Sequence, residues 1–146
     1  MKKKAIVSAC LLGVESRYDG GSNKLPDEKL RELKEKYELI PVCPECYGGL
    51  TTPRIPSERV GDKVLSKTGT DVTAEFARRA QAALYLARLF GADIAILKEN
   101  SPSCGFGRVY DGSFSKKLVE GNGIAADLLY ENGIEIFGEE SIDRLM

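Results

Sequence analysis

The stretch at residues 70–97, TDVTAEFARRAQAALYLARLFGADIAIL, predicts a helix that leads directly into a buried strand. Apolar side chains recur through the helix at the spacing of one helical face, and Thr70 or Asp71 can cap its start. Gly91 ends the helix, and residues 92–97 are short and mostly apolar, as in a strand covered on both sides. A helix followed at once by such a strand is typical of a parallel sheet.

The rest of the chain continues this alternation. Short apolar runs predict three further strands at 4–9, 38–42 and 134–137, and Pro41 places the second at a sheet edge or a strand end. We therefore expect one α/β domain over residues 1–146, a small three-layer Rossmann-like fold with a mainly parallel sheet and helices on both faces. The other expected segments are helices at 26–36, 121–131 and 142–146, a small hairpin at 59–67, and irregular stretches at 43–57 and 98–120.

The composition fits a single globular domain and restricts its chemistry. Of the 146 residues 42% are hydrophobic, and 21 basic and 22 acidic side chains give a net charge of −1. The opposite charges are interspersed, which argues against a broad nucleic-acid-binding surface. No histidine is present, so Ser-His and Cys-His nucleophile pairs are excluded, together with the commonest protein ligand for zinc and copper.

The first ten residues resemble a lipoprotein export signal, because three lysines precede VSAC at 7–10. An export signal needs an apolar core of about 7–15 residues, whereas only residues 5–9 separate the lysines from Cys10. No stretch approaches the length of a transmembrane helix. We therefore expect a cytoplasmic protein that does not interact with membranes.

Three cysteines follow three of the predicted strands. Cys10 directly follows the first strand, Cys43 directly follows the second, and Cys104 lies a few residues beyond the third. Open parallel sheets bind ligands beyond the carboxyl ends of their strands, so this topology brings the three thiols to one edge. Cysteines are often small core residues, but burial alone does not predict this shared placement.

Thiolates in a chain without histidine suit soft metals, which leaves zinc, copper(I) and iron–sulfur clusters open. A closed zinc site would have to add the fourth cysteine, Cys46. A [4Fe–4S] cluster on the other three cysteines would leave one iron open as a Lewis acid.

Cys43-Pro-Glu-Cys46 is also the C-x-x-C pattern of a redox dithiol, but a proline-rich loop follows it instead of the helix that lowers the pKa of such thiols.

Charged residues near the first two cysteines are candidates for a site. Glu45, two residues after Cys43, can exchange protons or position water, or it can pair with Arg17 or Arg54. Arg17 and Asp19 place one cation and one carboxylate near Cys10, or they form a solvated ion pair in a tight turn.

The third cysteine lies in a stiff turn. Ser101 and Ser103 present hydroxyls beside Cys104 that can bind a ligand or cap the next turn. Lys98, at the end of the predicted strand, can bind an anion or stay exposed.

These residues form a set of motifs that runs over nearly the whole chain. The motifs are SACLLG (8–13), RYDG (17–20), PVCPE (41–45), GGL (48–50), PR (53–54), Lys98 with SPSCG (101–105), and YDG (110–112). No single one is specific, but in this order they resemble the TudS-like thiouracil desulfidases. By this resemblance the chain is identified as a member of that family.

The resemblance implies an enzyme that carries a [4Fe–4S] cluster on Cys10, Cys43 and Cys104. The implied reaction is a non-redox desulfuration, in which a thiolated pyrimidine such as 2-thiouracil becomes the oxo base and sulfide is released. Glu45 would transfer protons or activate water, and Ser101 would orient the ring or the intermediate. The remaining motif residues predicted to bind the substrate are Arg17, Tyr18, Asp19, Lys98 and Ser103.

One position departs from the family pattern. Family members commonly have a cysteine just before RYDG, and this chain has Ser16 there. A redox or sulfur-relay role of that cysteine would be absent here, whereas a cluster on three cysteines does not need it. Cys46 is not part of the family motif, so no role is carried over to it.

Other functions fit parts of the sequence. A non-catalytic metal, iron–sulfur or cysteine redox module is suggested by Cys46 and by Ser16. A nucleotide-binding protein is suggested by Gly48-Gly49, but no G-x-G-x-x-G follows the first strand. For the enzyme, a free thiobase, a nucleoside and thiolated tRNA all fit, and the short chain with balanced charge favours a small molecule.

Overall fold

A central sheet of four parallel strands organises the chain. The computed structural model describes residues 2–13, 24–42, 57–99, 105, 108–110, 112–115, 117–139 and 141–145. The strands are β1 (Lys3–Ser8), β2 (Tyr37–Val42), β5 (Ile94–Leu97) and β8 (Glu135–Gly138), in the order β2-β1-β5-β8. Every pair in this sheet is parallel. The expectation that the strand with Pro41 lies at an edge is therefore confirmed.

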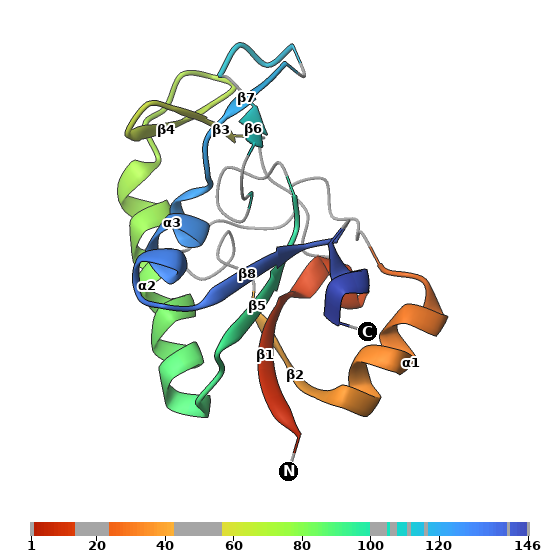
Figure 1. The fold of residues 1–146 in the computed structure, drawn as a ribbon. Coiled ribbons are helices and arrows are strands. Elements are labelled where there is room, and N and C mark those ends of the chain that lie inside the picture. Colours follow the sequence, from red (N-terminus) through yellow and green to blue (C-terminus); the bar gives the residue numbers. More distant parts are fainter. Residues whose placement is uncertain are drawn as a thin grey trace.

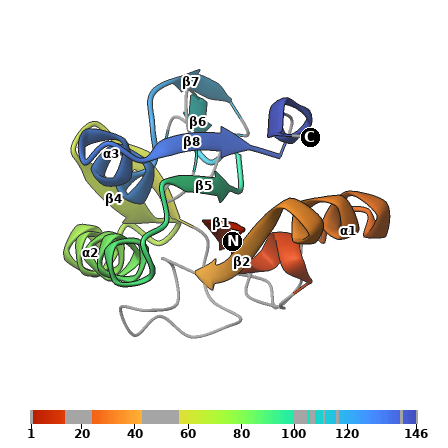
Figure 2. The same cartoon turned by 60° about the horizontal axis from the view of Figure 1, so that its bottom comes forward.

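Helices cover both faces of the sheet, as expected. α2 (Thr73–Phe90) and α3 (Ile124–Glu131) lie on one side, and α1 (Asp27–Lys36) lies on the other with the short C-terminal turn η2 (Ile142–Leu145) (Figures 1 and 2). The short 3-10 helix η1 (Ala9–Leu12) follows β1 without a gap. The predicted α/β fold class, three layers around a mainly parallel sheet, is confirmed.

The alternation of side chains along β1 divides the core into two clusters. Ile6 packs with buried residues of α2 and α3, such as Leu84 and Leu129. Val7 points to the opposite face and packs with Leu33 of α1. Successive residues of a strand face opposite sides, so an uninterrupted apolar run is what a strand covered on both faces requires.

α2 starts three residues later than the sequence pattern predicted and ends where it predicted. The Asp71 carboxylate accepts hydrogen bonds from the Thr73 hydroxyl at 2.6 Å and from the Thr73 amide at 2.9 Å. These bonds lower the pKa of Asp71 below its ordinary value. Gly91 adopts a left-handed conformation with φ of 71° and ends the helix, which a residue with a Cβ would do at a steric cost.

Two hairpins lie beyond the carboxyl end of the main sheet (Figure 1). The first, β3 (Ser57–Val60) and β4 (Lys63–Ser66), turns at Gly61 as predicted. The second, β6 (Arg108–Tyr110) and β7 (Leu118–Glu120), lies where the sequence predicted irregular structure, so that prediction was wrong. Strands of three residues are too short to show a recognisable alternation of apolar and polar side chains. β6 also contacts β3, which is distant in sequence.

An ion pair joins the first hairpin to α3. Arg59 Nη1 lies 2.6 Å from Asp127 Oδ2 and donates to the Asn122 carbonyl at 2.5 Å. Asn122 Nδ2 donates to the other Asp127 oxygen at 2.8 Å. Both charged side chains are mostly buried, so the pair is screened less than a surface pair. In the described ranges, no helix is long and apolar enough to cross a membrane.

Replacing Leu33 by Ala is expected to lower the free energy of unfolding by about 2–5 kcal/mol, because Leu33 is the fully buried anchor of α1. The measurement is urea unfolding followed by circular dichroism. Leu30→Ala on the same helix is the control, because Leu30 is only partly buried, and it should cost less. Equal losses in the two variants would contradict the anchoring role of Leu33.

Candidate functional site

The register of the sheet places the ends of its strands at a common edge. Ser8, the last residue of β1, pairs with Val42, the last residue of β2. Leu97, the last residue of β5, pairs with Gly138, the last residue of β8. In sequence, Cys43 directly follows Val42, Cys10 lies two residues after Ser8, and Lys98 directly follows Leu97. This carboxyl edge is where open parallel sheets bind ligands.

Cys10 lies in η1, immediately beyond β1, and its side chain is partly buried. Two contacts fix this turn. Leu11 is fully buried in the α1-side core, the cluster that also contains Leu33 of α1, and the Leu25 amide donates to the Leu11 carbonyl at 2.9 Å. Gly13 closes the turn with φ of 100°, and its amide donates to the Cys10 carbonyl at 3.3 Å. The thiol is therefore fixed at the edge by a rigid local structure and is not completely withdrawn from solvent.

Ser8 links β1 to β5 at this edge. Its side chain is buried, and Ser8 Oγ accepts a hydrogen bond from the Lys98 backbone amide at 2.9 Å. The bond crosses from the strand that leads to Cys10 to the strand that leads to Cys104. A buried amide needs such an acceptor once the regular pairing of the strands has ended.

Lys98, predicted to bind substrate, lies at the carboxyl edge beside Glu139. Its ammonium is 2.6 Å from Glu139 Oε1 and 3.2 Å from the Glu99 carbonyl. The same Glu139 oxygen accepts a hydrogen bond from the Glu99 amide at 3.1 Å. Contact between Lys98 and a substrate stays a prediction. The structure shows that Lys98 pairs with the Glu139 carboxylate, which sequence reasoning missed. Glu139 directly follows the fourth strand, so the rule that located the cysteines would also have located it.

The other predicted site residues lie outside the described ranges. These are Arg17, Tyr18, Asp19, Cys43, Glu45, Ser101, Ser103 and Cys104, together with Ser16 and Cys46. Their roles stay predictions. Within the described ranges no group of three or more potential ligands is found that could hold a metal, and Cys10 is the one cysteine that these ranges contain.

A buried carboxylate, that of Glu58, binds the backbone at Gly112, the last residue of the YDG motif. Glu58 Oε1 accepts hydrogen bonds from the Gly112 amide at 2.9 Å and the Phe114 amide at 3.3 Å. Gly112 has φ of 94°, and a Cβ there would overlap the side chain of Val60. A glycine is therefore required both by the backbone conformation and by the close approach of β3.

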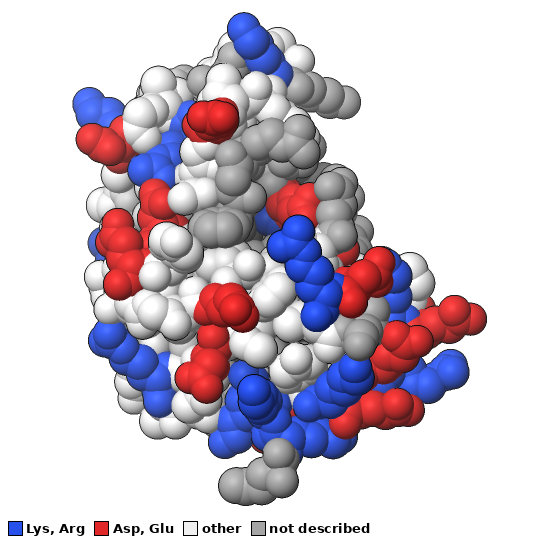
Figure 3. Space-filling model, in the orientation of Figure 1, with Lys and Arg blue, Asp and Glu red and all other residues white. Residues whose placement is uncertain are grey.

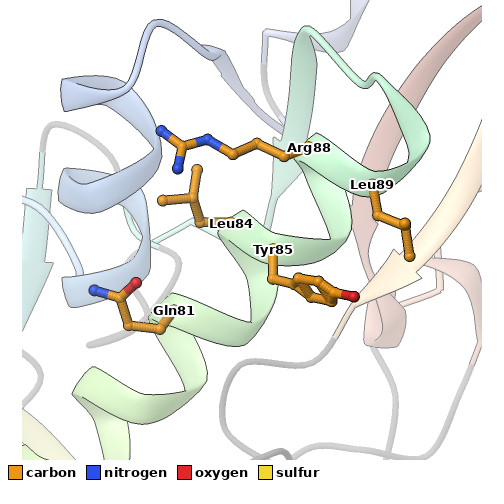
Figure 4. Close-up of a pocket in the computed structure, with 5 residues that line it drawn as sticks. All are labelled: Gln81, Leu84, Tyr85, Arg88 and Leu89. Atoms are coloured by element: carbon orange, nitrogen blue, oxygen red, sulfur yellow. The ribbon is translucent and has the colours of Figure 1, made fainter.

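A surface depression of about 390 Å³ lies on α2 and is separate from the carboxyl edge. Gln81, Leu84 and Arg88 point toward α3, and Tyr85 and Leu89 point to the other side of the helix (Figure 4). The end of α2 is joined through Gly91 to the beginning of β5, so this depression lies toward the amino ends of the strands. Parallel sheets bind ligands at the opposite end.

Charges on the face shown in Figure 3 are mixed, with acidic and basic side chains side by side. The interspersed charge read from the sequence is thus visible on this face. Basic side chains gather at the lower edge of this face, with acidic ones beside and above them, so the described residues form no basic stripe across it of the kind that binds nucleic acid (Figure 3).

Comparison with known proteins identifies the family. The family model described as 2-thiouracil desulfurase matches residues 5–141. The chain belongs to the 2-thiouracil desulfurase family. It is 37% identical over 151 residues to the uncharacterized protein YbbK of Bacillus subtilis (strain 168), covering 97% of this chain and 99% of that protein.

A solved structure of a family member has the same fold. It is described as the [4Fe–4S]-dependent thiouracil desulfidase TudS, and it matches with a TM-score of 0.93 and 46% sequence identity over 99% of this chain and 95% of that one. The family resemblance and the fold class expected from the sequence are confirmed. The expected enzyme class, a desulfidase, and the expected [4Fe–4S] cofactor agree with these descriptions.

The donor set of this chain suits an iron–sulfur cluster. Cys10 offers a soft thiolate at the edge where ligands of this fold bind, and it is partly shielded from water by the α1-side core. Two further motif cysteines follow the other two strands that flank the same edge. Without histidine, the chain lacks the nitrogen ligand that most protein sites for harder transition metals use.

Replacing Ser8 by Ala is expected to lower the free energy of unfolding by about 1–3 kcal/mol, because it leaves the Lys98 amide without its acceptor. It should also reduce the iron bound per chain after anaerobic reconstitution, since the Lys98 amide at the end of β5 is no longer tied to β1 by the Ser8 side chain. Both quantities are measured on the same preparation, by denaturant unfolding and by iron analysis.

Ser66→Ala is the matched control for this variant. Ser66 is also a buried serine, and its hydroxyl accepts a hydrogen bond from the Thr70 amide at 3.1 Å in the first hairpin. It should cost stability but leave the iron content unchanged. Equal loss of iron in both variants would show that Ser8 has no special connection with the site.

Proposed function

We propose that this chain desulfurises a thiolated pyrimidine such as 2-thiouracil to the oxo base, with release of sulfide and with a [4Fe–4S] cluster as cofactor. The observation that carries the proposal is the placement of Cys10 at the carboxyl edge of a parallel sheet whose neighbouring strands lead into Cys43 and Cys104. Membership of the family supports the same reaction. The proposed substrate class is a small thiolated base.

Cys10, Cys43 and Cys104 would hold the cluster. Three protein thiolates are one fewer than the number of irons, so one iron is left without a protein ligand. When bound, the cluster supplies a thiophilic Lewis acid that makes a thiocarbonyl carbon more electrophilic and sulfide a better leaving group. The sum of the reaction, C=S plus water giving C=O plus hydrogen sulfide, needs no net electrons.

The chain supplies the proton transfers and the binding of the ring. Glu45 is proposed to take a proton from the attacking water and to return one to the departing sulfur, since no histidine can do so. Ser101 is proposed to orient the ring by hydrogen bonding. The residues proposed to form the rest of the binding site are Arg17, Tyr18, Asp19, Lys98 and Ser103.

The proposed setting is the cytoplasm, with a small molecule as the partner. A [4Fe–4S] cluster with an open iron is sensitive to oxidation, and the reducing cytoplasm keeps cysteine thiols available as ligands. The mixed charge on the face in Figure 3 supports a small substrate over a nucleic acid.

The metal content of cysteine variants tests the cluster. After anaerobic reconstitution, the protein is expected to hold about four irons and about four acid-labile sulfides per chain. Cys10→Ala, Cys43→Ala and Cys104→Ala should each lower both values, because each removes one thiolate ligand. Cys46→Ala is the control and should keep both values. Tightly bound zinc that depends on Cys46 would contradict the cluster and favour a non-catalytic metal module.

The turnover of 2-thiouracil tests the role of Glu45. Glu45→Gln should keep the iron content and lower kcat by about 10²–10⁴-fold, because the amide cannot exchange the proton. The measurement is uracil formation followed by its ultraviolet absorbance, with sulfide determined in parallel. A Glu45→Gln variant that is as active as the unchanged protein would remove Glu45 from the mechanism.

A further inference from the structure

Four polar groups form a connected cluster where β1, β5 and β8 end, and the proposed mechanism does not use three of them. The cluster, called the edge clamp here, consists of Ser8, Lys98, Glu99 and Glu139. The Lys98 amide donates to Ser8 Oγ at 2.9 Å, and the Lys98 ammonium lies 2.6 Å from Glu139 Oε1. The Glu99 amide donates to the same Glu139 oxygen at 3.1 Å. One side chain from β1 and one from beyond β8 thus hold two consecutive residues at the end of β5.

We propose that Glu139 is a positioning residue of the desulfidase site, which acts by fixing the end of β5 from which the chain continues to Ser101 and Cys104. This inference rests on the proposed function, because it assigns Glu139 a role in that site. Only one residue separates Ser101 from Glu99, so the direction in which β5 ends limits where that motif can lie. Glu139 touches neither substrate nor cluster in this proposal.

The burial of the ion pair supports a positioning role. The side chains of Lys98 and Glu139 are 28% and 26% exposed, so the pair is screened by water much less than an exposed pair such as Lys24 and Asp27. Charge-assisted hydrogen bonds of this kind are shorter and stronger than neutral ones. The Glu139 oxygen also accepts a backbone amide, which ties the ion pair to the course of the main chain.

The Glu99 side chain completes the contact between the ends of β5 and β8. It lies against Gly138, where a Cβ would overlap its carboxylate. Leu97 pairs with Gly138 in the sheet, and the clamp begins at the next residue of each strand. Side-chain contacts of Glu139 with Lys98 and Glu99 therefore continue the link between β5 and β8 beyond their last backbone pair.

The clamp also changes the expected role of Lys98. With a carboxylate at 2.6 Å, the ammonium is already neutralised as an ion pair, so its charge is not available in full to a substrate. The clamp therefore predicts that removing either member of the pair affects the geometry of the site. The proposed contact of Lys98 with the substrate would in addition change KM, whereas the positioning role of the pair shows in kcat.

The test compares Glu139→Ala, Glu139→Gln and Lys98→Met with Glu135→Gln. Glu135 is the first residue of β8, and Glu139 follows the last one, so the Glu135 variant removes the same charge at the opposite end of that strand. Glu139→Ala is expected to lower kcat for 2-thiouracil about 10–100-fold with little change in KM, as for other residues that orient a metal site. Glu139→Gln keeps an accepting oxygen and should restore part of the loss. Lys98→Met should lower kcat to a similar extent, with any rise in KM reporting its proposed contact with the substrate. The double variant should have a kcat no lower than either single variant.

A second readout does not depend on turnover. Hydrogen exchange of the apo protein should become faster at the amides of Lys98 and Glu99 in Glu139→Ala, and unchanged there in Glu135→Gln. Unchanged exchange and unchanged kcat in Glu139→Ala would overturn the proposal. A loss of kcat in Lys98→Met with an unchanged kcat in Glu139→Ala would also overturn it, because Lys98 would then act without Glu139. Absence of iron and turnover in the unchanged protein would overturn the proposed function, and the exchange measurement would still decide whether Glu139 fixes the end of β5.

Discussion

The parallel pairing of β1 with both β2 and β5 is the constraint on which the rest of the structure depends. Because all three strands run in the same direction, each ends at the same edge, and whatever follows each strand in sequence is delivered there. Cys10 reaches the edge through a single turn of 3-10 helix. The alternative, a site assembled from one continuous loop, would need the loop itself to be rigid. Here the rigidity comes from backbone hydrogen bonds within a buried sheet, and the loops need only to present side chains.

This arrangement requires that both faces of the sheet be covered, and the sequence meets the requirement with two different helix layers. α2 contributes six buried side chains and packs closely with α3, whereas α1 contributes one, Leu33. At the carboxyl edge the backbone pairing stops, and side chains continue it. Ser8 Oγ accepts a hydrogen bond from the Lys98 amide, and Glu139 accepts one from the Glu99 amide. In the hairpin region, Glu58 accepts hydrogen bonds from the Gly112 and Phe114 amides. At these three places, buried or half-buried oxygens replace strand partners.

The fold could be predicted well because it follows from periodicity and topology. The long helix up to Gly91, the strand that follows it, and the edge position of Pro41 all appear in the structure as expected. β6 and β7 could not be predicted, since each has only three residues and β6 contacts β3, which is distant in sequence. The same limit applies to the site. The position of Cys10 follows from local sequence, but the pairing of Lys98 with Glu139 joins residues 41 positions apart and depends on β5 lying beside β8. Which charges meet across a sheet is a property of strand order, which the sequence pattern leaves open.

The difference between the two helix layers has a consequence for how the protein opens. α1 has one buried side chain, whereas α2 has six and also packs against α3, so partial unfolding should begin at α1 and leave α2 and α3 docked. Cys10 and Leu33 belong to the same cluster on the sheet. A brief detachment of α1 would therefore expose the side of η1 that packs against α1, including Cys10, to dissolved oxygen, while the rest of the fold stays intact. The lifetime of an air-sensitive cofactor at this position would then be governed by local opening of the thinner layer and not by global stability.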